Sequence, residues 1–75
     1  MHPSDVAMLF EELLETDDIA VDDNFFDMGG SSVLALRLLL ELDKRCGVTL
    51  SLIDVLHNPT PQALAGKLAE AAGPA

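Results

Sequence analysis

The apolar residues near the start of the chain recur at the spacing of one helical face. Positions separated by three and four residues share such a face, and those that do so are Val6, Leu9, Phe10, Leu13 and Leu14. Ser4 precedes them and is a favourable N-cap, and Asp5 suits the positive end of the helix dipole. The pattern predicts a first helix that begins after Ser4.

A second helix is predicted from Ser32 to about Cys46, because Gly47 suits a left-handed C-cap and basic residues precede it. Its apolar residues form two stripes. The wider one suits a core and consists of Leu34, Ala35, Leu38, Leu39, Leu42 and Cys46. The second stripe, roughly opposite, consists of Val33, Leu36 and Leu40. A small bundle covers one side of this helix, so the second stripe is either buried by neighbouring loops or exposed as a docking surface.

The last part of the chain predicts a short helix followed by a longer one. Residues 48–50 alternate like a strand, but a lone strand of this length has no partner. A short helix after Ser51 is expected instead, with Leu52, Ile53, Val55 and Leu56 as its apolar residues. Thr60 then caps a last helix that has Pro61 at its first position and that Gly73-Pro74 ends.

A long connection over residues 17–31 joins the first two helices, and its apolar side chains are expected to attach it to the core. They are Ile19, Val21, Phe25, Phe26 and Met28, and Gly29-Gly30 supplies the turn into the second helix. These elements predict an all-α fold, a small bundle of three main helices and one short helix. We expect one domain over residues 1–75, with a helical core over about 4–72 and residues 73–75 as a tail or the start of a linker.

Charge is distributed unevenly along this 75-residue chain, which has a net charge of −9. Nine of its 13 acidic residues lie within positions 1–27, and all four basic residues follow Ser32. The balance argues against nucleic acid and anionic membranes as partners. It favours basic protein partners, or it serves only to keep an apolar domain soluble. With no signal peptide or membrane-spanning run, and with Cys46 as a lone buried thiol, we expect a cytoplasmic monomer.

The candidate chemistry centres on Gly29-Gly30-Ser31-Ser32, just before the second helix. No acid–base partner lies near these serines in the sequence, so modification of a hydroxyl is favoured over catalysis by it. A helix N-terminus also tolerates an attached phosphate group. Other sites are excluded: the acidic loop lacks the ligand order of a calcium loop, and His2 and His57 have no partner at metal-ligand spacing.

The segment Asp23-Asn24-Phe25-Phe26-Asp27-Met28-Gly29-Gly30-Ser31-Ser32-Val33-Leu34-Ala35 resembles the core motif of peptidyl carrier proteins, the phosphopantetheine-dependent carriers of nonribosomal peptide synthesis. Leu56-His57-Asn58-Pro59-Thr60 is similar to the family's element before the last helix. The resemblance covers residues 4–72. Acyl carriers of fatty-acid and polyketide synthesis usually show Asp-Ser-Leu at the modified serine, so the Gly-Gly-x-Ser form points to the peptidyl branch.

The resemblance implies a carrier, not an enzyme, with 4'-phosphopantetheine from coenzyme A attached to Ser32 and Ser31 in a variable position. The implied partners are a phosphopantetheinyl transferase, an adenylation enzyme, and condensation, tailoring or thioesterase enzymes. The predicted contact residues are Val33, Leu36, Leu40, Met28 and Ile53. Val33, Ile53 and Leu56 depart from the family's usual leucine, polar residue and phenylalanine. An acyl carrier is the first alternative, and a non-catalytic helical adaptor with Ser31 and Ser32 as capping residues is the second.

Overall fold

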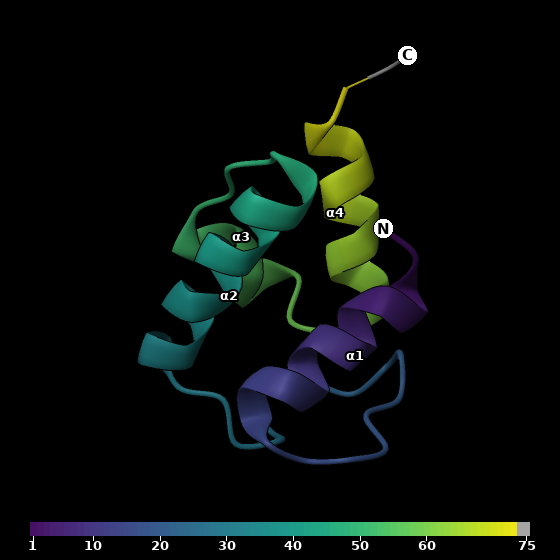
Figure 1. Ribbon diagram of the computed structural model, residues 1–75, viewed down its shortest axis with the longest axis vertical. Helices are drawn as coiled ribbons and strands as arrows, with labels where there is room; N and C mark the ends of the chain where they lie inside the picture. The colour runs from purple at the N-terminus through teal and green to yellow at the C-terminus, as the bar shows by residue number, and fades with distance from the viewer. Residues whose placement is uncertain (74–75) are drawn as a thin grey trace.

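The computed structural model describes residues 1–73, which form four helices and no strand (Figure 1). Their bounds are α1 (Pro3–Leu14), α2 (Ser32–Cys46), α3 (Leu52–His57) and α4 (Pro61–Ala71). α1 packs against both α2 and α4, and the short α3 packs against α2. The prediction of an all-α bundle with three main helices, one short helix and a long first connection is confirmed. Pro74, predicted to help end the last helix, lies outside the described residues.

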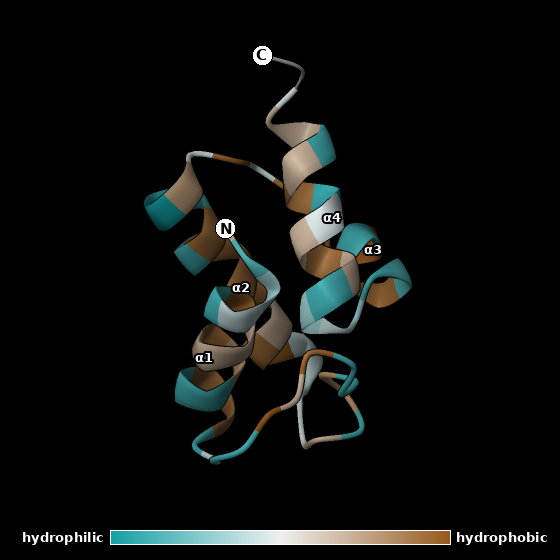
Figure 2. Cartoon of the chain, turned by 90° about the vertical axis from the view of Figure 1, so that its right-hand side faces the viewer, coloured by the Kyte–Doolittle hydropathy of each residue, from teal (hydrophilic) through white to brown (hydrophobic). Residues whose placement is uncertain are grey.

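The core is built from the apolar faces that the spacing predicts. In α1 the buried side chains include Val6, Leu9 and Phe10, and in α2 they are Ala35, Leu38 and Leu42. Figure 2 shows hydrophobic and hydrophilic segments alternating along these helices, as an amphipathic pattern requires. α4 adds Leu64 and Leu68 to the same core. The wider stripe of α2 is therefore its core face.

Local capping signals place three of the four helix starts where the sequence predicts them. The Ser51 hydroxyl accepts the Asp54 N–H, and the Asp54 carboxylate in turn accepts the Ser51 N–H at 2.9 Å. The Thr60 hydroxyl accepts the Ala63 N–H at 3.1 Å. Each hydroxyl satisfies a donor that the first turn leaves without a helical partner, so each fixes a helix start.

The predicted N-cap of α1 at Ser4 is wrong by two residues. His2 is the N-cap, Pro3 is the first helical residue, and Ser4 lies inside the first turn. The His2 N–H donates to the Asp5 carboxylate at 3.1 Å. Proline at the first helical position has no N–H to leave unpaired, and Asp5 satisfies the donor before it, so no serine cap is needed.

The long loop between α1 and α2 is attached to the core by Ile19 and Phe25, which are buried, with Phe26 partly buried beside them. Backbone bonds attach it as well: the Phe25 N–H donates to the Pro59 carbonyl at 2.8 Å, and the Gln62 N–H to the Val21 carbonyl at 2.9 Å. The expectation that the Val21 and Met28 side chains are buried is wrong, since both are exposed. Val21 is held through its carbonyl, which leaves its side chain outside.

Cys46 is half-buried, which corrects the expectation of a buried thiol. It lies in the last turn of α2 and borders a surface hollow with Val48 and Leu68, at the periphery of the core. Among the described residues, no helix is both long and apolar enough to cross a membrane.

Candidate functional site

The start of α2 gives its two adjacent serines different surroundings. Ser31 is the N-cap, with an extended backbone, and its hydroxyl accepts the Leu34 N–H at 3.3 Å. Ser32 is the first helical residue and is exposed, and its hydroxyl makes no hydrogen bond within residues 1–73. One hydroxyl therefore belongs to the helix cap, and the other is free to react.

The surroundings of Ser32 fit an attached phosphate. The first N–H groups of α2 have no helical carbonyl to bond, and the helix dipole adds about 0.3–1 kcal/mol in favour of a nearby anion. The first turn of α2 contains no acidic residue to oppose it. A phosphate group on the Ser32 oxygen would therefore lie where the helix favours negative charge.

The two glycines before the serines serve different purposes. Gly29 has φ +106°, a backbone conformation that side chains strongly disfavour, and the space around it is open. Gly30 has no such φ, but a Cβ built there would lie 2.6 Å from the Phe25 carbonyl oxygen. Gly29 makes the turn, and Gly30 allows the turn to lie directly against Phe25.

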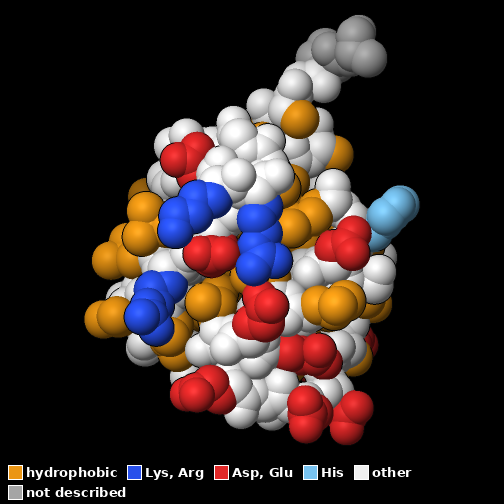
Figure 3. Space-filling model, in the orientation of Figure 1, with side chains coloured by type: hydrophobic (Ala, Val, Ile, Leu, Met, Phe, Trp, Pro, Cys, Tyr) orange, Lys and Arg blue, Asp and Glu red, His pale blue; other side chains and the backbone are white. Residues whose placement is uncertain are grey.

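The second stripe of α2 is exposed, which decides against its burial by the loop or the following turn. The exposed fractions are 68% for Val33, 52% for Leu36 and 62% for Leu40. On α3, Ile53 and Leu56 are exposed by 61% and 51%. Figure 3 shows hydrophobic side chains along the left of the molecule, the side on which α2 and α3 lie in Figure 1. We call Val33, Leu36, Leu40, Ile53 and Leu56 the apolar patch.

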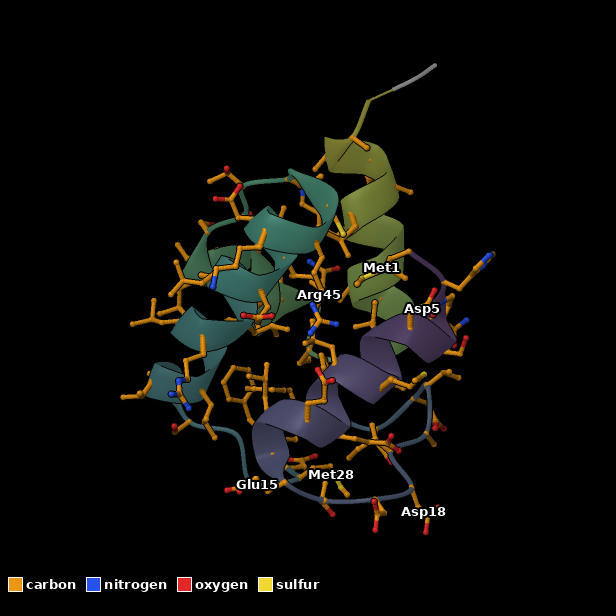
Figure 4. The ribbon with its side chains drawn as sticks, in the orientation of Figure 1. Met1, Asp5, Glu15, Asp18, Met28 and Arg45 are labelled. Carbon is orange, nitrogen blue, oxygen red and sulfur yellow. The ribbon has the colours of Figure 1, made fainter. Side chains whose placement is uncertain are left out.

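Three of the five predicted contact residues follow Ser32 on α2, and the other two lie on α3 and in the long loop. Val33, Leu36 and Leu40 lie on α2, one, four and eight residues after Ser32, and Ile53 lies on α3, which packs against α2. Met28 is exposed in the long loop, at the bottom of the molecule in Figure 4. Leu56 was not among the predicted contact residues. Its place three residues after Ile53, on the same face of a short helix, is the signal that points to it.

Acidic and basic side chains lie on different parts of the surface around the site (Figure 3). Asp and Glu gather over the lower part of the molecule, where α1 and the long loop lie, and Lys and Arg lie higher, over α2 (Figure 3). Arg45 reaches from α2 to Glu12 of α1 at 3.1 Å and also contacts Glu41. Arg37, which is exposed beside the second stripe, makes no ion pair with any described residue.

The Asp54 carboxyl holds α3 in place. Hydrogen bonds from the Ser51 N–H and hydroxyl lower the pKa of Asp54 below its ordinary 3.8, and the ammonium group of Lys67, 3.7 Å away, lowers it further. Because Lys67 belongs to α4, this carboxylate links α3, which carries part of the apolar patch, to the rest of the bundle.

A family model described as "Phosphopantetheine attachment site" matches residues 4–68 of this chain. The chain belongs to this family. A peptidyl carrier protein, solved in complex with the phosphopantetheine transferase Sfp and coenzyme A, has a TM-score of 0.88 and 30% identity, over 93% of this chain and 91% of that one. The chain is thus a carrier domain of the peptidyl branch, and the identification made from its motif is confirmed.

Its curated relatives are much longer proteins. The hybrid PKS-NRPS synthetase pynA of Aspergillus niger is 52% identical over 50 residues, which are 67% of this chain and 1% of the synthetase. Indigoidine synthase of Streptomyces lavendulae is 41% identical over 64 residues, which are 85% of this chain and 5% of the synthase. The chain therefore corresponds to a small part of each of these relatives.

Proposed function

We propose that Ser32 is the residue to which 4'-phosphopantetheine is attached, and that aminoacyl and peptidyl groups travel on this arm as thioesters. The observation that carries the proposal is the division between the two serines. The Ser31 hydroxyl accepts the Leu34 N–H, whereas the Ser32 hydroxyl is exposed at the helix N-terminus. When attached, the arm supplies the thiol that forms the thioester.

In the modification, the Ser32 oxygen forms a new bond to the phosphorus of the phosphopantetheine group of coenzyme A. The phosphoanhydride bond of coenzyme A breaks, the nucleotide part leaves, and the hydroxyl proton goes to a base of the transferase. The chain contributes a fixed helix start, free backbone N–H groups and the positive end of the dipole. All of these act on the phosphate, so the chain needs no base of its own.

The apolar patch is the proposed docking surface, with Met28 as a further predicted contact residue. Five exposed large apolar side chains on one side of the molecule make a patch of roughly a few hundred Å², the size of the largest apolar patch on a typical monomer, which is often functional. This is less than the roughly 800 Å² per partner of a stable complex, so contacts made by the patch are transient. Transient contact suits successive visits to a transferase, an adenylation enzyme and condensation, tailoring or thioesterase enzymes.

The attachment is tested by intact-mass spectrometry after incubation with coenzyme A and a phosphopantetheinyl transferase of broad specificity. We expect a single phosphopantetheine mass addition to the wild-type chain and none to Ser32→Ala. Loading by an adenylating enzyme then tests aminoacyl carriage. An unmodified wild-type chain, or a Ser32→Ala variant that still gains the mass, contradicts the proposal.

The docking surface is tested with Leu36→Asp and Leu40→Asp, which place a charge in the middle of the apolar patch. We expect loading to fall while circular dichroism still shows the helices, because both side chains already face solvent. Met8→Asp is the matched control, since Met8 is exposed by 62% on α1, away from the patch. Equal loading of all three variants and the wild type contradicts docking through the patch. Loss of helicity in the two leucine variants contradicts their exposed position.

A further inference from the structure

The glycine turn before α2 makes an unusually close contact with a buried ring. The Gly30 N–H donates to the Phe25 carbonyl at 2.9 Å. A Cβ built on Gly30 would lie 2.6 Å from that oxygen and 2.5 Å from Cε2 of the Phe25 ring. The backbone of Gly30 therefore lies directly against Phe25, two residues before Ser32, and a side chain at this position forces its surroundings to shift.

Phe25 is held from several sides. Its side chain is fully buried, and its ring meets Phe10 of α1 edge-on with the ring centroids 4.8 Å apart. Phe26 packs against the same ring, with centroids 5.4 Å apart. The Phe25 N–H donates to the carbonyl of Pro59, in the connection between α3 and α4. Phe25 therefore provides Gly30 with a reference point held by α1, by Phe26 and by the connection between α3 and α4.

We propose that Phe25 and Gly30 are positioning residues for phosphopantetheinylation, because their contact places the Ser32 hydroxyl relative to the apolar patch. The inference rests on the proposed attachment to Ser32. Carbon atoms pack about 3.5–4.0 Å apart, so a methyl group at Gly30 has to move roughly 1 Å away from the ring. Since Phe25 is fixed by the core, the movement falls on Gly30 and on the start of α2.

Four of the five residues of the apolar patch, Leu36, Leu40, Ile53 and Leu56, lie beyond this start and keep their exposure when Gly30 moves. A transferase that docks through the patch then still binds the carrier, but it meets a displaced hydroxyl. Misplacement by about 1 Å costs up to roughly a hundredfold in rate, whereas binding energy gathered elsewhere is retained. The contact between Phe25 and Gly30 therefore affects kcat and leaves KM unchanged.

The experiment is steady-state phosphopantetheinylation of Gly30→Ala with coenzyme A and a broad-specificity transferase. We expect kcat to fall roughly tenfold to a hundredfold with an unchanged KM for the carrier. In NMR spectra of the carrier alone, the amide signals of Ser31, Ser32 and Leu34 should shift, and those of α4 should not. Gly66→Ala is the matched control: it makes the same chemical change at a helical glycine with open space around it, and it should keep the wild-type kcat.

The Leu68→Val variant distinguishes the effect of a general loss of stability from the effect of a displaced Ser32 hydroxyl. Leu68 is buried in α4, outside residues 25–32, so this variant lowers Tm and should keep kcat wherever it is folded. If Gly30→Ala fails to fold, Phe25→Leu tests the same contact from the side of Phe25, because it removes the ring against which Gly30 lies. We expect this variant to lower kcat at an unchanged KM.

The proposal is overturned if a folded Gly30→Ala or Phe25→Leu variant has the same kcat as the wild type. It is equally overturned when Leu68→Val loses kcat to the same extent at the same folded fraction. Failure of the attachment to Ser32 is a separate result, since it appears as an unmodified wild-type chain or as modification of Ser32→Ala.

Discussion

Ser31 and Ser32 carry the same functional group one position apart, and the helix start assigns them different tasks. The N-cap residue has an extended backbone that brings its side chain back onto the first turn, and Ser31 does so with the Leu34 N–H. The first helical residue has no such bond to make, so the Ser32 hydroxyl stays in solvent. Reactivity at this site therefore follows from which serine the helix needs as its cap.

Ser31→Ala is expected to destabilise the domain while leaving the modification of Ser32 possible. Loss of a serine N-cap costs about 1 kcal/mol, which thermal denaturation of the apo protein measures. Intact-mass spectrometry should still show one phosphopantetheine per chain. Ser31→Asn keeps a capping oxygen and should recover most of the lost stability. If Ser31→Ala gains no phosphopantetheine although Ser32 is intact, the proposed modification of Ser32 is wrong.

Gly29→Ala is expected to lower the free energy of unfolding by about 1–2 kcal/mol, because φ at this position is +106° and a side chain resists such a conformation. Gly66→Ala should instead raise it by about 0.4–1 kcal/mol, since Gly66 lies inside α4 with open space around it. Urea denaturation of the two variants measures both values. Equal effects of the two changes would mean that the backbone of Gly29 is not constrained.

At the scale of the element, α3 depends on contacts at its ends more than on its own length. A helix of six residues has little stability alone, and the reciprocal bonds between Ser51 and Asp54 fix its first turn. The ion pair of Asp54 with Lys67 ties it to α4. Two of the five residues of the apolar patch, Ile53 and Leu56, belong to α3, so these few contacts also hold part of the apolar patch in position.

The stability that Asp54 contributes should depend on pH in the acidic range. Its pKa is lower in the folded chain than the ordinary 3.8, so its contribution is complete above about pH 4 and is lost as pH falls through the lowered pKa. We expect wild type to melt at a higher temperature than Asp54→Asn at pH 6, and the difference to shrink below pH 4. Thermal melts of the two proteins from pH 6 to pH 2.5 check this. A difference that stays constant over this range would contradict the lowered pKa.

The sequence predicts those features of the elements that local signals determine. Ser51, Thr60 and Gly47 mark helix ends through bonds and backbone conformations that involve only neighbouring residues, and each lies at the predicted place. The first helix begins earlier than predicted because Pro3 and Asp5 make a serine cap unnecessary.

Features that depend on contacts between distant residues could not be read from the sequence. The exposure of the second stripe depends on where α3 and the loop pack, and periodicity contains no information on that. Val21 looked like a core residue by its type, yet its carbonyl bonds to Gln62 and its side chain faces solvent. The sequence alone also could not show which of the two adjacent serines caps α2, and in the structure it is Ser31.

At the scale of the whole molecule, the dominant feature is an excess of negative charge gathered at one end. The described residues extend over 34 × 21 × 20 Å, and the acidic residues of α1 and the long loop share the lower part of this volume (Figure 3). The four ion pairs among the described residues are at or near the surface, where each contributes little. Repulsion among the carboxylates therefore outweighs attraction, and the folded state is expected to be under electrostatic strain at low salt.

Raising the salt concentration should consequently stabilise the carrier domain. At 0.01 M salt the Debye length is about 30 Å, as long as the molecule itself, whereas at 0.5 M it falls to about 4 Å and only direct neighbours interact. A gain of about 1 kcal/mol would raise Tm by roughly 4–8 °C in a domain of this size. Differential scanning calorimetry in sodium chloride at pH 7 measures the shift.

The control is a triple variant, Asp17→Asn/Asp18→Asn/Asp22→Asn, which changes three exposed loop positions and brings the net charge from −9 to −6. Its Tm should respond less to salt than that of the wild type. A Tm that falls as salt rises would mean that the Arg45–Glu12 pair and its neighbours outweigh the repulsion, and that the acidic end costs the fold nothing.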